Sequence, residues 1–232
     1  MSDLTALQLI QRVIAKSGAP SRPQTVDYVS AGDPTRAVTG IAVMVQATLE
    51  GLRQAANANA NLVFTYDPAF WATGDDLTRM ETDALFVEKR DFIRAHNLVV
   101  FNLHDHLRDS MPDRIAAGMA QALGWQSESA NINLFRRPPT TLLALAQELG
   151  TKLDDKSLRV VGDPALAVST IATSFGNTQQ MPGIGLLNGA IDLLVCGYAR
   201  EWEVVEYGQD MISAGLKKAV VLLGENASVQ AG

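Results

Sequence analysis

The sequence predicts an α/β protein built from two related α/β lobes, with mixed or parallel sheets flanked by helices. Two observations lead to this class. Short apolar runs alternate with longer runs of helical spacing, which is typical of βαβ units. A turn motif and the strands that follow it also occur twice, which indicates an internal duplication. We assign residues 1–130 to the first lobe and residues 131–232 to the second.

The first lobe is predicted to begin with an amphipathic helix within residues 1–19, because apolar and polar side chains alternate there at helical spacing. A connector rich in Pro, Ser and Gly follows, and strands and helices then alternate. The predicted strands are residues 26–30, 39–45, 61–65 and 98–103, and the predicted helices are residues 48–58, 83–97 and 112–123. Gly124 is expected to end the last of these helices.

The duplication is visible in two pairs of segments. Gly-Asp-Pro at residues 32–34 recurs at 162–164, and the apolar strand at 62–64 has a counterpart at 193–195. Two copies indicate two lobes of similar design, since a solenoid needs at least three repeats. The remaining elements of the second lobe are a strand at 133–139 ending in a Pro-Pro turn, a helix at 141–150, the segment 157–161 that begins the second copy, and a final strand at 219–223.

Composition excludes several classes of protein. The 232 residues are 47% apolar and 19% charged, with a net charge of -6, and a mildly acidic chain without a basic block is not expected to have nucleic acid as its main partner. The lone cysteine, Cys196, cannot form an internal disulfide. No apolar run is long enough to cross a bilayer or to act as a signal peptide. We therefore expect a cytoplasmic protein without a membrane partner.

Polar side chains follow four of the predicted strands. In open α/β sheets such positions line the ligand crevice, so we expect them to form one site. His104 and His106 are the most informative pair, because residues two apart in a continuing strand face the same side and could reach one metal ion or one substrate group. The alternative is that one of them caps a helix or bonds to the backbone. The side chains at the four strand ends are Tyr66 and Asp67; His104, Asp105 and His106; Tyr198, Arg200 and Glu201; and Glu225 with Asn226.

Several of these residues also have simple structural explanations. Asp67 precedes a proline and suits a turn. Glu201 is at the start of a predicted helix, where an acid is favoured by the helix dipole. Glu225 follows a glycine and could be an ordinary loop carboxylate. Cys196 is expected to be inert core.

From about Val26 onward, the chain resembles the Nif-three-like family of dinuclear-metal hexameric proteins, whose members are also known as type-2 GTP cyclohydrolase I homologues. Members of this family have two related α/β lobes, a metal pair between them and a toroidal hexamer. The segments that carry the resemblance are residues 32–34 with 38–41, 61–63, 67–70, 104–106, 162–164 and the run Ala-Arg-Glu-Trp-Glu-Val-Val-Glu-Tyr at 199–207.

The chain departs from the family at most of the positions where the resemblance implies metal ligands. His104 matches a family ligand, whereas the other positions have changed. Tyr66 and Glu225 stand at family histidines, Tyr198 and Val229 at glutamates, and Arg108, with Asp109 next to it, at an aspartate. A pair of divalent ions needs several donors, some of them bridging, so one ion is expected here rather than two.

The resemblance thus implies a metal-dependent hydrolase acting on a nucleotide or related small molecule. The expected ligands of a Zn, Mn or Fe ion are His104, His106, Asp109 and Glu225, with Asp67 or Glu201 as the catalytic base and Tyr66 and Tyr198 lining the site. The alternative is a non-catalytic hexameric scaffold or binding protein that has lost its metals, in which the two tyrosines fill the old site or stack on a ligand. A metal chaperone or reservoir is a third interpretation.

Overall fold

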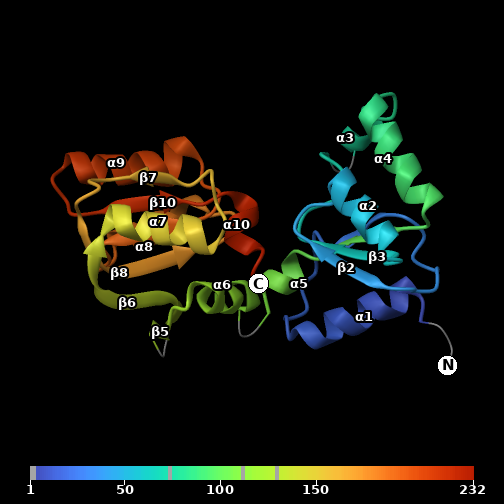
Figure 1. Ribbon diagram of the computed structural model, residues 1–232, viewed down its shortest axis with the longest axis horizontal. Helices are drawn as coiled ribbons and strands as arrows, with labels where there is room; N and C mark the ends of the chain where they lie inside the picture. Colours follow the sequence, from blue (N-terminus) through green and yellow to red (C-terminus); the bar gives the residue numbers. More distant parts are fainter. Residues whose placement is uncertain (1–3, 73–74, 111–112, 129–130) are drawn as a thin grey trace. The chain divides into compact units, whose positions relative to one another are not determined.

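The computed structural model describes residues 4–72, 75–110, 113–128 and 131–232. The chain forms two compact units, Met1–Pro112 and Asp113–Gly232, each with its own sheet. The mixed sheets flanked by helices confirm the predicted fold class (Figure 1). In the described part of the chain, no helix is both long and apolar enough to span a membrane.

The first unit contains a four-stranded sheet with the order β1-β4-β3-β2. Strands β2, β3 and β4 are parallel, and β1 pairs antiparallel with β4. The strands are β1 (Tyr28–Ala31), β2 (Ile41–Met44), β3 (Leu62–Thr65) and β4 (Val99–Asn102). The helices are α1 (Ala6–Ser17), α2 (Leu49–Asn57), α3 (Asp75–Thr78), α4 (Ala84–Ala95) and α5 (Asp105–Arg108).

Helices cover both faces of this sheet. Leu62 and Phe64 of β3 pack with Ile10 of α1, whereas Val63, between them, packs with Leu52 of α2. Figure 1 shows α1 on one face and α2 and α4 on the other. This explains why β3 and β4 are uninterrupted apolar runs, since both faces of each strand are buried.

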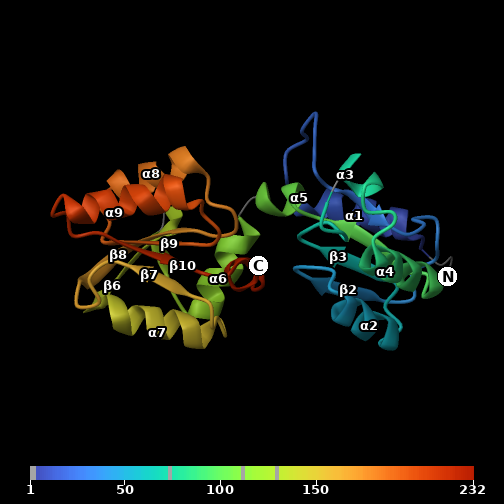
Figure 2. The same ribbon diagram turned by 90° about the horizontal axis from the view of Figure 1, so that it is seen from above.

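The second unit has a six-stranded sheet with the order β5-β6-β8-β9-β10-β7. Figure 2 shows α8 and α9 on one face of it and α7 on the other. The strands are β5 (Ser127–Glu128), β6 (Asn131–Thr141), β7 (Arg159–Val161), β8 (Ala167–Ser174), β9 (Leu193–Cys196) and β10 (Ala219–Leu222). The helices are α6 (Arg114–Leu123), α7 (Leu142–Lys152), α8 (Gln180–Asn188), the π-helix η1 (Glu201–Val205), α9 (Glu206–Ser213) and α10 (Glu225–Val229).

The predicted end of the strand at the two prolines is wrong. β6 continues through Pro138 and Pro139 to Thr141. Its pairing with β8 is irregular between Arg136 and Thr140, so the prolines occupy the stretch where the register shifts. A proline has no N–H for the ladder and is tolerated at such an irregularity.

The two units repeat one topology, as the duplication predicts. The order β1-β4-β3-β2 recurs as β7-β10-β9-β8, with the same parallel and antiparallel pairings. The turns after β1 and β7 are also held alike. The N–H of Leu7 donates to the carbonyl of Pro34 at 2.9 Å, and the N–H of Leu143 donates to that of Pro164 at 3.0 Å. The helix before each first strand is therefore fixed to the Gly-Asp-Pro turn in the same way.

Side-chain caps set the helix starts. Thr5, Thr48, Asp83, Asp113 and Thr141 each accept a backbone N–H of the first turn that follows. Such caps satisfy donors that have no partner within the helix. The helix expected to begin at 112 begins instead at Arg114, and residue 112 itself lies outside the described residues. Gly124, in the left-handed conformation, ends this helix as predicted.

One lysine of the first unit is buried. Lys89 is 4% exposed; its ammonium donates to the carbonyl of Ala69 and lies 5.0 Å from the centre of the Trp71 ring. Burial lowers the pKa of Lys89 from 10.5 to about 8.

This burial predicts a pH dependence of stability. Between pH 8 and 10.5 the folded state has lost the Lys89 proton while the unfolded state keeps it, so the free energy of unfolding should rise with pH. Measured against Lys89→Met by denaturation at each pH, the wild-type chain should gain at most about 1.4 kcal/mol per pH unit. Cys196, whose pKa burial raises to about 12, contributes equally to both proteins and cancels. A difference that is flat across this range would contradict the burial of the ammonium.

Candidate functional site

A buried aspartate organises the end of β4. Both carboxylate oxygens of Asp27 accept backbone N–H groups, from His104 at 2.7 Å, from Asp105 at 2.6 Å and from His106 at 3.0 Å. The same carboxylate lies 2.6 Å from Nδ1 of His106, and the Asp27 side chain is 1% exposed. A negative group at the start of a helix satisfies its unpaired donors and suits its dipole. Asp27 therefore caps α5 from a distant part of the sequence.

The cap changes the geometry expected for the two histidines. His104 is the N-cap residue of α5 and His106 lies within this helix, so the strand does not continue and the two side chains do not share one face of a strand. The strand ends at Asn102 because Asp27 draws the next backbone amides into a helical turn. Each imidazole is anchored through Nδ1, to Asp105 at 3.1 Å for His104 and to Asp27 for His106. Nε2 is then the ring nitrogen available to a ligand.

Tyr66, His104 and Arg108 form the Tyr66 cluster. The rings of Tyr66 and His104 lie 4.6 Å apart between centroids, and Nη1 of Arg108 donates to the Tyr66 hydroxyl at 3.4 Å. The Tyr66 side chain is buried, whereas the His104 side chain is 31% exposed. Tyr66 follows β3 and His104 follows β4, so the structure brings these two expected site residues together.

Arg22 forms ion pairs with two carboxylates beside this cluster. Its guanidinium lies 2.6 Å from Asp105 and 2.6 Å from Asp109. Burial opposes ionisation of Asp105, but hydrogen bonds from the N–H of Val26 and from Arg22 outweigh it and hold the pKa of Asp105 well below its usual range. Asp109, an expected metal ligand, is therefore paired with an arginine in this structure.

Asp67, an expected catalytic base, lies in the turn after β3. Its carboxylate accepts a hydrogen bond from the side-chain amide of Gln46 at 3.2 Å, and its own N–H donates to the carbonyl of Val45 at 3.1 Å. Both contacts come from the end of β2. They are the contacts of a turn residue joining two neighbouring strand ends.

The other expected site residues belong to the second unit. Tyr198 follows β9 and is 53% exposed. Glu201 opens η1, at a helix start as expected, and lies 2.5 Å from Arg159 of β7. Glu225 is the first residue of α10, so the loop position considered for it is wrong. Cys196 is fully buried in β9, as expected.

In the second unit, as in the first, an aspartate binds the backbone of the segment that follows the last strand. Asp155, which precedes β7, accepts the N–H of Gly224 at 2.6 Å, just as Asp27 precedes β1 and accepts the amides after β4. Because Gly224 directly precedes α10, this bond fixes where Glu225 begins its helix. Within either unit, the described His, Cys, Asp and Glu side chains include no group of three that could hold a metal ion.

Sequence reasoning missed Asp27 and Arg22. Asp27 is the second residue of a predicted strand, where it resembles an ordinary surface acid, and Arg22 lies in the connector before that strand. The backbone groups that donate to the Asp27 carboxylate lie 77 to 79 residues away in the sequence. One available signal was the pairing of β1 with β4, which brings the residues before β1 to the end of β4.

The fold and part of the sequence are similar to those of known proteins. A model of the family described as Duf34/NIF3 (NGG1p interacting factor 3) matches residues 24–216. A solved hypothetical protein of Staphylococcus aureus, SA1388, is 15% identical with a TM-score of 0.74, and the match covers 98% of this chain and 88% of that one. A Bacillus cereus protein related to NIF3 is 12% identical with a TM-score of 0.75, covering 98% and 90%.

A third similar structure is reduced HcgD from Methanocaldococcus jannaschii, 11% identical with a TM-score of 0.66, covering 100% of this chain and 91% of that one. Among curated proteins there is no match. At these identities the solved structures establish a shared fold, and the match over residues 24–216 is the finding that bears on the family.

Proposed function

Because the chain belongs to the Duf34/NIF3 family, we propose that it is a metal-independent binding protein for a small anionic molecule, held at the Tyr66 cluster. The observation that carries this proposal is the contact between Arg108 and the Tyr66 hydroxyl, 3.4 Å long. Both residues stand where the family resemblance implies metal ligands. A guanidinium repels a cation and binds carboxylates and phosphates. Tyrosine and arginine in place of metal ligands therefore favour the binding of an anion over that of a cation.

The surrounding charges support the same conclusion. A metal ion needs donors whose lone pairs are available, and the Asp109 carboxylate is already bound by Arg22 at 2.6 Å. A neutral tyrosine, with an ordinary pKa near 10, is a poor ligand for Zn²⁺ or Mn²⁺. Of the family's ligand positions in the first unit, His104 alone retains the family residue. These residues do not fit a metal pair.

The ligand class follows from the cluster itself. Arg108 offers a charged donor, His104 offers Nε2 at a partly exposed position, and Tyr66 packs behind the imidazole. A nucleotide combines the required anionic group with a planar ring, and it is the class that the family resemblance implies. Assembly into a hexamer remains a prediction of the same resemblance.

A metal-dependent hydrolase is the second candidate, and one observation favours it. Both imidazoles contact a carboxylate through Nδ1, at 3.1 Å for His104 and 2.6 Å for His106. Metal-binding histidines are typically oriented by such contacts. In this case His104, His106, Asp109 and Glu225 would hold one ion, which would supply a hydroxide for hydrolysis. Asp67 or Glu201 would be the base.

Calorimetric titration with GTP in the presence of EDTA tests the first candidate. We expect measurable binding by the wild-type chain and weakening of about tenfold or more in Arg108→Met, which removes the charge but keeps most of the stem. Arg53→Met is the matched control, because Arg53 lies on α2 and pairs with Glu88 at 3.3 Å, away from the cluster. Product analysis in separate samples free of EDTA, with and without Mn²⁺, tests the second candidate.

The outcomes separate the two candidates. GTP binding that survives EDTA and depends on Arg108, without product formation, supports the binding protein. Hydrolysis that appears only with added metal and is lost in His104→Ala supports the hydrolase and contradicts the first proposal. Binding that is equally strong in Arg108→Met would also contradict it.

A further inference from the structure

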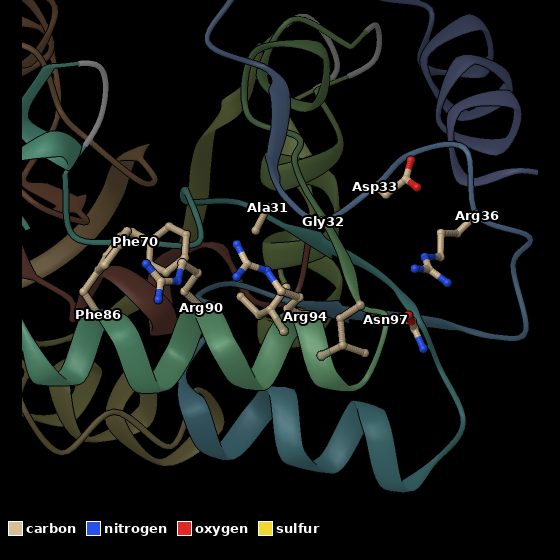
Figure 3. A pocket seen from close by; sticks show the side chains of 11 residues that line it. Ala31, Gly32, Asp33, Arg36, Phe70, Phe86, Arg90, Arg94 and Asn97 are labelled. Carbon is tan, nitrogen blue, oxygen red and sulfur yellow. The ribbon is translucent and has the colours of Figure 1, made fainter. Parts of the chain in front are cut away.

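A cavity lies in the first unit, lined by residues of α4 and of the segments that follow β1 and β3. It has a volume of about 410 Å³ and borders Leu98, which precedes β4, whereas His104 follows that strand (Figure 3). Tyr66, His104 and Arg108 are not among the residues that line it, so the two sites share no lining residue. Ligand cavities in proteins usually measure about 300 to 1,000 Å³, so this cavity could hold a small organic molecule.

The wall of this cavity is largely apolar. Phe70, Phe86, Ile93 and Leu98 contribute to it. The two phenyl rings lie 4.7 Å apart between centroids and are tilted by 45°. Aromatic side chains of this kind pack well against a flat apolar ring.

The rim of the cavity carries an excess of positive charge. Arg36, Arg90 and Arg94 line it together with one acid, Asp33. In Figure 3, Arg90 and Arg94 rise from α4 beside Phe70 and Ala31, and Arg36 approaches from the loop after β1. Hydrogen bonds from the hydroxyl and N–H of Thr35 lower the pKa of Asp33 and occupy its carboxylate.

The arginines on α4 share one further carboxylate. Nε of Arg90 lies 3.0 Å from Asp91, and Arg94 lies 4.0 Å from the same oxygen. The Arg94 side chain is 75% exposed, so its guanidinium can be reached from solvent. Its position in the last turn of α4 suits the helix dipole, which explains one arginine but not the convergence of three on one cavity.

We infer that this cavity binds a small organic anion, a carboxylate or a phosphate ester carried on an aromatic ring. The ring lies between the phenylalanine side chains and the aliphatic wall, and the oxyanion meets the guanidinium groups at the rim. Arginine suits both anions because its planar fork matches their geometry. This inference does not depend on the function proposed for the Tyr66 cluster.

Titration of the ¹⁵N-labelled full chain with benzoate, phenyl phosphate and benzyl alcohol tests the inference by NMR. We expect at least one of the two anions to shift the amide signals of Gly32 and Asn97 with a saturating curve. The neutral alcohol should need a concentration about tenfold higher, since it lacks the charge. Whether one or both anions bind identifies the oxyanion that the rim prefers.

Variants distinguish this cavity from the rest of the surface. Arg90→Met combined with Arg94→Met should weaken binding of the anion about tenfold or more. Arg53→Met and Arg108→Met should leave it unchanged. The inference is overturned if benzyl alcohol binds as tightly as the anions, if the double variant binds normally, or if neither anion shifts these signals at concentrations up to about 10 mM.

Discussion

Asp27→Ala should destabilise the first unit by about 3 kcal/mol, because it leaves several buried donors without an acceptor. Three backbone N–H groups and the His106 imidazole contact this carboxylate, which is 1% exposed. Loss of the cap should also release the start of α5 and with it His104. Hydrogen exchange of the β4 amides measures the stability of this unit directly.

Two variants make the result interpretable. Asp27→Asn should be intermediate, because its amide oxygen can still accept from two backbone groups while its NH₂ faces the His106 donors. Asp163→Ala is the control, since the Asp163 carboxylate accepts the N–H of Ala165 in an exposed turn. If Asp27→Ala costs no more than this control, Asp27 does not organise the end of β4.

Gly32→Ala is the second change expected to have a large effect, with a cost of about 3 kcal/mol or more. Gly32 has φ +89°, and a Cβ there would lie 2.1 Å from the carbonyl oxygen of Leu98 and 2.8 Å from Cα of Val99. The Gly-Asp-Pro turn could close only by moving away from β4. Chemical denaturation of the variant measures the cost.

Two other glycines separate the cost of the positive φ from the cost of the steric clash. Gly215 has φ +85° with open space around it, so Gly215→Ala should cost only about 1 kcal/mol for the backbone conformation. Gly185 lies in α8 with open space, and Gly185→Ala should be neutral or stabilise by up to about 1 kcal/mol. A Gly32→Ala cost no greater than that of Gly215→Ala would show that the close approach to β4 is unimportant.

The sequence predicted the architecture because its signals are local. The uninterrupted apolar runs of β3 and β4 follow from burial on both faces, and the repeated Gly-Asp-Pro turns follow from a shared need for a positive φ at Gly32 and Gly162. The caps of α1, α2, α4, α6 and α7 are likewise side chains next to their own helices. These features can be recognised without knowing any distant contact.

The candidate site was harder to predict because its contacts span long stretches of sequence. Whether His104 continues a strand or begins a helix depends on Asp27, and the ion pair that occupies the Asp109 carboxylate depends on Arg22. The sequence at residues 104–106 gives no sign of either distant partner, Asp27 or Arg22. The identity of Arg108 was visible, but its contact with Tyr66 requires β3 and β4 to lie side by side.

The π-helix η1 is a further feature that local patterns did not reveal. Its acidic start was expected to be an ordinary helix start, but Glu201–Val205 adopts the wider π turn. Glu203 within it is 8% exposed and lies 3.3 Å from Arg200. Buried Val204 and Val205 pack against the apolar core of the second unit, so burial of this segment selects a winding that propensity alone does not favour.

The metal content of the purified chain after exposure to Zn²⁺ or Mn²⁺, followed by gel filtration and elemental analysis, tests the central claim most directly. We predict far less than one ion per chain for the wild type. Tyr66→His combined with Arg108→Asp, which restores the donors of the family resemblance, should retain more metal. Retention of about one ion or more by the wild type, with its loss in His104→Ala, would contradict the proposal that arginine has replaced metal at this site.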